Sequence, residues 1–243
     1  REPQVQTMTY LDADLFFFWP VSAVFSEQGR ASVGIVPHRF PPRLADMNRF
    51  GTYNVAWVSF RRDHSGLACV EWWRERCLEW CHDRPEPGRF ADQGYLNEFP
   101  RRFSKVKALD HPGINAGPWN MEGVALTSGE AGPRINGRPL LFFHYQGVRE
   151  LMPDWFDPGL APYRTPFTPE LRHLIYWPYL RRLATEQRRL QREFGIDVPL
   201  GYQRLPAGDL WQQLQSRVLA RWVLPGYRRL CGRLLHCPPD EGG

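Results

Sequence analysis

Apolar residues along the first part of the chain alternate between the period of strands and the period of helices. Strand patterns are expected in five segments, the last two interrupted by loops: residues 5–14, 31–40, 52–63, 105–120 and 133–147. In the last of these, Asn136-Gly137 predicts a hairpin turn before the strand "PLLFFHY", which has the pattern of a buried strand. This alternation of strands and helices is typical of an α/β fold.

Three helices are expected between these strands. One is short and ends at Gly29, a second opens at Ser65, and a third, shorter one covers residues 89–99. The second helix predicts a face that packs on the sheet, formed by Leu67, Val70, Trp73, Cys77, Leu78 and Cys81.

A Pro-rich crossing at residues 152–169 separates these elements from a basic C-terminal part. A helix is expected from Thr168, which with Glu170 resembles a capping box, and it is expected to kink or restart at Pro178. A second Arg-rich helical pattern covers residues 208–237. We therefore expect two domains, residues 1–163 and a basic helical extension at residues 164–243.

Two carboxylates interrupt an apolar run in "TMTYLDADLFFFWP", where Asp12 and Asp14 have no Lys or Arg nearby. Burial of an unpaired carboxylate is costly, so such groups should be paired, protonated or bound to a metal. In an extended strand, residues two apart point to the same face. The spacing therefore predicts that both carboxylates hold one divalent cation through oxygen ligands.

Further segments follow this pair in a fixed order: "GTYNVAWVSFRRD", "FADQGYLNEF", "PGINAGPWN" and "LLFFHYQGV". The succession resembles the GT-A glycosyltransferases of the glycogenin and lipopolysaccharide galactosyltransferase kind, over about residues 5–150. The resemblance implies a GT-A-like mixed sheet flanked by helices. It also implies transfer of a sugar from a nucleotide-diphosphate sugar to an acceptor hydroxyl of a glycan or a lipid-linked acceptor, with retention of configuration.

The resemblance assigns roles to nine residues. Asp12, Asp14 and His144 would hold Mn²⁺ or Mg²⁺, Asp92 and Gln93 would bind sugar hydroxyls near the reacting carbon, and Asn54, Gly147, Trp119 and Asn120 would contact donor or acceptor. Each residue alone has a simpler interpretation. His144 fits a buried strand, Asp92 and Gln93 fit a helix cap, and Trp119 fits the core.

The fold that the resemblance implies has a nucleotide-binding βαβ unit before the Asp-x-Asp strand, whereas only eleven residues precede Asp12. The first residues, "REPQVQT", contain neither an initiator Met nor an apolar signal core. We therefore expect the chain to be the C-terminal part of a longer enzyme, to be inactive alone, and to expose a sheet edge.

Charge and cysteine content set the remaining expectations. Residues 164–237 contain 13 Arg against five acidic residues, with Trp, Tyr and Leu between them, which favours an anionic membrane surface over nucleic acid as a partner. The five cysteines form no disulfide or zinc framework and indicate a cytoplasmic protein, peripheral on the membrane if these helices bind lipid. No apolar run is long enough to cross a membrane.

Two other classes of function share some of these features. Phosphatases of the haloacid-dehalogenase type also end a strand in Asp-x-Asp, but they need a later Lys and an acidic pair, and Lys105 and Lys107 are the only lysines. A non-catalytic protein that binds a membrane surface or an acidic partner would need only the Arg-rich helices. The ordered set of motifs favours the transferase.

Overall fold

The computed structural model describes residues 4–152, 155–196 and 235–236. They form two compact units, residues 1–145 with 163–165, and residues 146–162 with 166–243. The first boundary lies earlier than the expected division at residue 163, because the segment after Tyr145 packs with the second unit. Each unit is described by itself.

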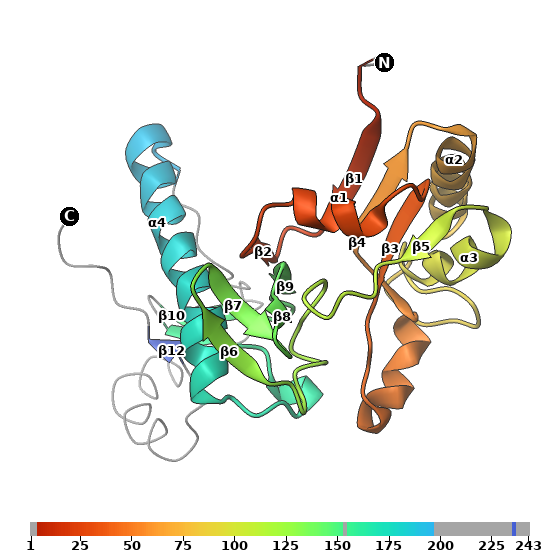
Figure 1. The fold of residues 1–243 in the computed structure, drawn as a ribbon. Helices are drawn as coiled ribbons and strands as arrows, with labels where there is room; N and C mark the ends of the chain where they lie inside the picture. Colours follow the sequence, from red (N-terminus) through yellow and green to blue (C-terminus); the bar gives the residue numbers. More distant parts are fainter. Residues whose placement is uncertain (1–3, 153–154, 197–234, 237–243) are drawn as a thin grey trace, which may run out of the picture. The chain divides into compact units, whose positions relative to one another are not determined.

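The first unit is built on a mixed four-stranded sheet, with helices against it (Figure 1). The strand order is β1-β4-β3-β5, with β4 antiparallel to both of its neighbours and β3 parallel to β5. The bounds are β1 Thr7–Leu11, β3 Val33–Pro37, β4 Tyr53–Arg61 and β5 Val106–Ala108. The expected α/β class with a mixed sheet is therefore present.

Short elements complete the first unit. The helices are α1 Ser22–Gln28, η1 Pro42–Phe50, α2 His64–Glu79, η2 Gly94–Glu98 and α3 Phe99–Arg102. The further strands are β2 Leu15–Phe17, β6 Leu126–Gly129, β7 Gly132–Ile135, β8 Arg138–Pro139 and β9 Phe142–His144, where β2 pairs with β9 and β7 joins β6 to β8. The predicted Asn136-Gly137 turn joins β7 to β8, and both residues have positive φ, 51° and 76°.

Successive side chains of a strand point to opposite faces of the sheet, and an apolar cluster packs on each face. On one face Val58 and Phe60 pack with Cys69 and Trp73 of α2. On the other face Trp57 packs in a cluster with Val24 of α1, Leu109 and Phe142 of β9. The sheet therefore fixes β9, which carries His144, against β4.

The buried face of α2 differs from the predicted one. Cys69 and Trp73 are buried, whereas Leu67 and Leu78 are 53% and 75% exposed. Gly66 lets the first turn approach β4 closely, because a Cβ at this position would lie 2.1 Å from the Arg61 carbonyl oxygen. The helix is therefore rotated so that Gly66, Cys69 and Trp73 face the sheet, and the prediction of the apolar face was wrong at Leu67, at Leu78 and at Cys81, which is exposed beyond the end of α2.

Strand β1 is an edge of the sheet. Met8, Tyr10 and Leu11 are 54%, 41% and 43% exposed, and β1 pairs with β4 alone among the described strands. An edge strand with exposed apolar side chains is a surface that natural proteins normally cover. The expectation of an exposed sheet edge is met at β1.

The second unit contains β10 Arg149–Met152, β11 Trp155–Asp157, η4 Leu171–Tyr176, α4 Trp177–Phe194 and β12 Leu235–His236, and η3 Ala161–Tyr163 lies at its border with the first. The Thr168 hydroxyl accepts the Leu171 N–H, as the capping pattern predicted. The helix restarts as α4 with Pro178 in its first turn, as expected. The second predicted Arg-rich helix, residues 208–237, lies outside the described residues except at its end.

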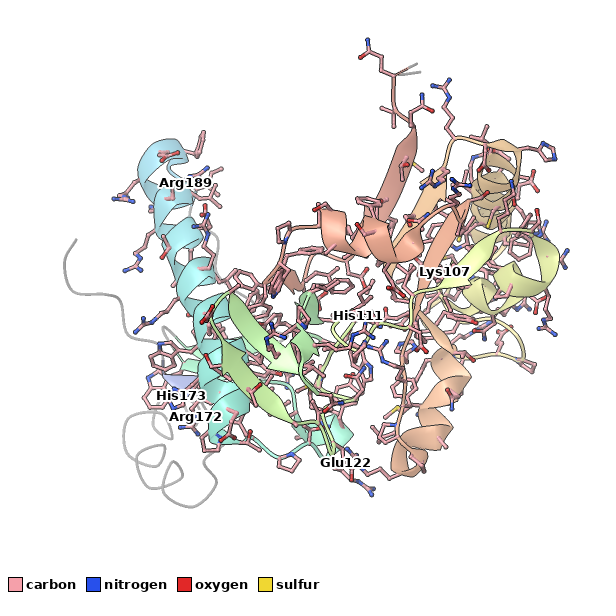
Figure 2. The ribbon with its side chains drawn as sticks, viewed as in Figure 1. Lys107, His111, Glu122, Arg172, His173 and Arg189 are labelled. Carbon is pink, nitrogen blue, oxygen red and sulfur yellow. The ribbon has the colours of Figure 1, made fainter. Side chains whose placement is uncertain are left out.

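The loop before β9 depends on a close approach at Gly113. Its carbonyl accepts the N–H groups of Leu141 and Phe142, and its own N–H donates to Nδ1 of His111, labelled in Figure 2. A Cβ on Gly113 would lie 1.9 Å from the Pro139 carbonyl oxygen, so only glycine fits.

We expect Gly113→Ala to lower the free energy of unfolding by about 2 kcal/mol or more, because two segments of backbone must separate. Urea unfolding followed by circular dichroism measures it. Gly123→Ala is the control: Gly123 has φ +67° but no atom within 4 Å of a Cβ, so it should cost only about 1 kcal/mol. Equal losses in the two variants would contradict the close approach at Gly113.

Candidate metal centre

Three of the residues singled out in the sequence meet at one end of the sheet. The ligand atoms of Asp12, Asp14 and His144 all lie within 4.8 Å of one another. His144 Nε2 is 3.0 Å from Asp14 Oδ1 and 3.8 Å from Asp12 Oδ2. No other group of three or more His, Cys, Asp or Glu residues with this spacing occurs in the described part of the chain.

The carboxylates reach this point from a turn. Strand β1 ends at Leu11, and residues 12–14 lead directly into β2. The Asp12 N–H donates to the Ala56 carbonyl of β4 at 3.3 Å, and the Asp14 carbonyl accepts the Tyr145 N–H at 2.9 Å. The expectation that both carboxylates stand on one face of a strand was wrong, because pairing of β2 with β9 bends the chain after Asp12.

Pairing of β2 with β9 also places the imidazole. Leu15 lies opposite His144 in this antiparallel pair, so the residue before Leu15, Asp14, falls beside His144. The backbone N–H of His144 donates to the Ala116 carbonyl at 2.8 Å, and the ring is packed edge-on against Trp119 with centroids 5.2 Å apart. The backbone of β9 is therefore fixed by the strand pair and by Ala116, and Trp119 packs against the imidazole.

The donor set fits a divalent cation. His144 Nε2 is buried, lies 3.0 Å from Asp14 Oδ1 and makes no hydrogen bond of good geometry, so these two groups can share a ligand. The side chains of Asp12 and Asp14 are 23% and 38% exposed, so an ion held between them would keep positions open toward solvent. Two carboxylates and one imidazole are side chains that bind divalent cations in proteins.

Asp12 lies in an environment that disfavours its charge. Burial is the largest cause that raises its pKa, Asp14 and Asp92 raise it further, and His144 acts in the opposite direction. Tyr10, on the exposed strand β1, hydrogen-bonds to Asp12 and was not singled out in the sequence. Its position two residues before Asp12 in a strand is the signal that would have found it. A bound cation would offset the repulsion among these carboxylates.

Asn54 and Gln93, two further candidates, bond to a stretch of β4 in which the register shifts. Ile35 of β3 pairs with Val58, but the next residue, Val36, pairs with Asn54, so residues 55–57 have no partner in β3. Two N–H groups in this stretch are bonded by side chains instead. Asn54 Oδ1 accepts the Ala56 N–H at 2.8 Å, and Gln93 Oε1 accepts the Val55 N–H at 3.1 Å.

Gln93 is thereby tied to the protein at both ends of its amide. Its Nε2 donates to the Phe50 carbonyl at 2.8 Å while its Oε1 holds Val55. Its contact with a sugar hydroxyl stays a prediction. The alternative interpretation of the Gln93 side chain as a helix cap is not met, because η2 begins without a side-chain cap.

Asp92 lies near Asp12 and follows Ala91, which has a positive φ of 44°. Strained backbone of this kind is frequent beside functional groups. Burial raises the pKa of Asp92, and hydrogen bonds from backbone N–H groups oppose this shift. Asp92 is therefore a carboxylate brought to the centre from a segment far from Asp12 in sequence.

Trp119 and Asn120 are both held in place by hydrogen bonds to the backbone of His38. Trp119 is 2% exposed and its Nε1 donates to the His38 carbonyl at 2.7 Å. Asn120 Nδ2 donates to the same carbonyl at 2.9 Å, and Asn120 Oδ1 accepts the Gly117 N–H at 3.0 Å. The core interpretation of Trp119 is the one that the structure supports, and acceptor contact by either residue stays a prediction.

His38 was missed in the sequence. It follows β3, packs against Phe40 and Trp119, and has an Nδ1 without a hydrogen-bond partner. Burial lowers the pKa of His38 to about 3, so the ring is neutral. No sequence pattern marked it, because a His at a strand end has many interpretations.

Gly147, the remaining candidate, belongs to the second unit, and its place relative to the three ligands is not described. It has φ +81° and packs backbone to backbone on Gly159. Arg149, a cation in the same segment, pairs with Asp157 at 3.2 Å. Phosphate contact by this segment stays a prediction.

Two of the five Arg side chains of α4 are paired with acidic neighbours on the same helix. Arg189, labelled in Figure 2, contacts Glu186 and Glu193 at 3.2 and 3.4 Å, and Arg182 contacts Glu186 at 2.7 Å. Such pairs along a helix are typical of a solvent-exposed face. Among the described helices, none is long and apolar enough to cross a membrane.

A cleft of about 390 Å³ opens beside the Gln93 segment, lined by Asn48, Arg49, Gly51, Pro85, Glu86, Pro87, Gly88, Arg89, Gly94 and Asn97. Its cations are paired, Arg89 with Glu86 and Arg49 with Asp46. None of the three metal-ligand candidates lines this cleft.

Comparison with known proteins does not indicate a function for this chain. No protein-family model matches the chain. No solved structure matches it either. The uncharacterized protein YfnF of Bacillus subtilis (strain 168) is 39% identical over 156 residues, 60% of this chain and 51% of YfnF. The uncharacterized protein YfnD of the same organism is 28% identical over 188 residues, 76% of this chain and 60% of YfnD. The chain thus spans about half to three fifths of the length of these relatives.

The raised pKa of Asp92 predicts a pH-dependent effect of Asp92→Asn. A carboxyl whose pKa is raised on folding destabilises the fold as pH rises from its unfolded pKa through its folded pKa. We expect Asp92→Asn to melt at a higher temperature than the wild type at pH 8, and the gain to vanish near pH 4.

Asp63→Ala is the control, because its effect on the melting temperature at pH 8 should have the opposite sign. Asp63 caps α2, accepting the Gly66 N–H at 2.9 Å, and these hydrogen bonds lower its pKa. Its loss should cost about 1 kcal/mol at pH 8, and less as pH falls through the folded pKa. Thermal melts at both pH values measure the two variants. A lower melting temperature of Asp92→Asn at pH 8 would contradict the account of Asp92.

Proposed function

We propose that the chain is the metal-binding part of a GT-A glycosyltransferase, which moves a sugar from a nucleotide-diphosphate sugar to an acceptor hydroxyl. The observation that carries this proposal is the meeting of Asp12, Asp14 and His144 within 4.8 Å. The resemblance marked these three residues together, although His144 is far from the carboxylates in sequence. A chance Asp-x-Asp would not predict which distant histidine meets it.

The residues of the chain supply a charged and positioned site. Mn²⁺ or Mg²⁺ held by Asp12, Asp14 and His144 would neutralise the charge that develops on the departing diphosphate. The Asp12 carboxylate is oriented by its hydrogen bond with Tyr10, and the Tyr145 N–H fixes the backbone of Asp14, whose carboxylate lies 3.0 Å from His144 Nε2. Asp92 would accept hydrogen bonds from hydroxyls of the donor sugar, because it is the further carboxylate that acts on Asp12.

The rest of the longer protein would complete the donor site. The curated relatives are longer than this chain, and β1 leaves apolar side chains exposed along an edge of the sheet. Strands of a nucleotide-binding unit paired with β1 would cover this edge and lie beside the carboxylates. The activity is therefore proposed for the whole protein.

The phosphatase alternative is less well supported. A phosphoryl-accepting Asp in such enzymes works beside a Lys, but the groups that shift the pKa of Asp12 are His144, Asp14, Asp92 and Tyr10. Lys107 lies on β5 and pairs with Glu27 at 3.7 Å (Figure 2). Binding of an anionic surface by the basic extension stays a prediction, since much of that extension lies outside the described residues.

The test is calorimetric titration of UDP, with and without Mn²⁺, into the protein encoded by the whole reading frame. We expect UDP to bind at least tenfold more tightly with Mn²⁺, and Asp12→Asn and Asp14→Asn to remove this gain. Asp46→Asn is the control, because Asp46 is an exposed acid on η1 that pairs with Arg49. If neither UDP nor GDP binds with Mn²⁺ present, the proposed function is wrong.

A further inference from the structure

The side chain of Asn54 lies between its own strand and the candidate metal ligand His144. Asn54 Nδ2 is 3.3 Å from His144 Nδ1, and Asn54 Oδ1 accepts the Ala56 N–H at 2.8 Å. Asn54 and His144 are 3% and 2% exposed, so water does not compete for these contacts. The two hydrogen bonds connect the register shift in β4 directly to the imidazole.

The chemistry of these groups fixes the direction of both bonds. A backbone N–H can only donate, so the Asn54 atom that faces Ala56 is the oxygen. The amide nitrogen then faces His144 Nδ1, and an amide nitrogen can only donate. Nδ1 must therefore carry the lone pair. In a neutral imidazole the proton then lies on Nε2, the nitrogen that faces Asp14 at 3.0 Å.

This proton stands where a cation would bind. A metal at Nε2 needs the lone pair there, so the proton must move to Nδ1, with no change in the number of protons on the ring. At Nδ1 the proton would face the Asn54 amide group, donor against donor. Turning the amide over would only place its nitrogen against the Ala56 N–H instead. In either arrangement one buried donor loses its partner.

We infer that Asn54 is a positioning residue that stabilises the metal-free tautomer of His144 and thereby weakens binding of the cation by the protein alone. Asp12 and Asp14 attract the cation, and Asn54 opposes the third ligand. Firm binding then requires an additional anionic ligand, such as a diphosphate, on the open positions of the ion. This inference rests on the metal role proposed above and explains how the ion would stay exchangeable between ligands.

The tautomer can be measured on the wild-type protein without any metal. Nitrogen-15 spectra of histidine-labelled protein at pH 8 distinguish a ring protonated at Nε2 from one protonated at Nδ1, and His144→Gln identifies the His144 signals. We expect a ring that carries its proton on Nε2 and none on Nδ1. A ring protonated at Nδ1, or at both nitrogens, would overturn the inference. Because no metal is present, this result does not depend on the proposed function.

A substitution tests the consequence for metal binding. Asn54→Asp keeps an oxygen for the Ala56 N–H and offers a second oxygen to His144 Nδ1–H, so Mn²⁺ alone should bind at least tenfold more tightly. The control is Asn54→Asp in the His144→Gln background, which adds the same charge at the same place without an imidazole for the new carboxylate to hold. In that background we expect Asn54→Asp to change Mn²⁺ affinity less than threefold.

The outcomes separate the two proposals. An equal gain from Asn54→Asp in the wild type and in the His144→Gln background would mean that added charge alone strengthens binding, which would overturn the role of Asn54. Failure of every variant to bind Mn²⁺, with the wild-type ring protonated at Nε2, would leave the tautomer assignment standing and contradict the proposed function. The wild-type spectrum decides the inference even if Asn54→Asp does not fold.

Discussion

The antiparallel pairing of β2 with β9 is the interaction on which the candidate centre depends. Two strands of three residues each bring Asp14 beside His144, since Leu15 and His144 are paired across the ladder. So short a pair is not stable alone. It is held because Phe142 belongs to the apolar cluster that includes Trp57 of β4, and because the Gly113 carbonyl accepts the N–H groups of Leu141 and Phe142 at the start of β9.

The register shift in β4 is the second constraint. It leaves backbone N–H groups of Val55 and Ala56 without partners in β3, and buried N–H groups must be bonded. Side chains of Gln93 and Asn54 supply those bonds, and Asn54 also faces His144. The same irregularity therefore removes part of the sheet ladder and orients a metal ligand. This combination is frequent where a sheet carries a functional site.

Much of the fold followed from local sequence patterns, and the failures have physical causes. The strands β3, β4 and β9, the Asn136-Gly137 turn and the restart of the helix at Pro178 were predicted because period and turn chemistry act locally. The face of α2 was mispredicted because the contact with the sheet is set by Gly66 and Cys69, which are small and weak in an apolar pattern.

Within the candidate site, Asp12 and Asp14 were predicted from their spacing and His144 from the resemblance, but the way they meet was not predicted. The turn at Asp12 and Asp14 arises from a strand pair between distant segments, which no local pattern encodes. His38 was missed for the same reason, whereas Tyr10 could have been found from its place two residues before Asp12 in the strand. The hydrogen bonds of Gln93 and Asn54 follow from a register shift, and register is set by packing across the whole sheet.

The proposed site requires that Asp12, Asp14 and His144 hold a single divalent cation. The most direct measurement is titration of Mn²⁺ into the protein, followed by electron paramagnetic resonance of the free ion, for the wild type and for Asp12→Asn, Asp14→Asn and His144→Gln. The account predicts one ion per chain, with affinity reduced at least tenfold in each variant. Absence of binding in the wild type, or unchanged affinity in the three variants, would contradict it.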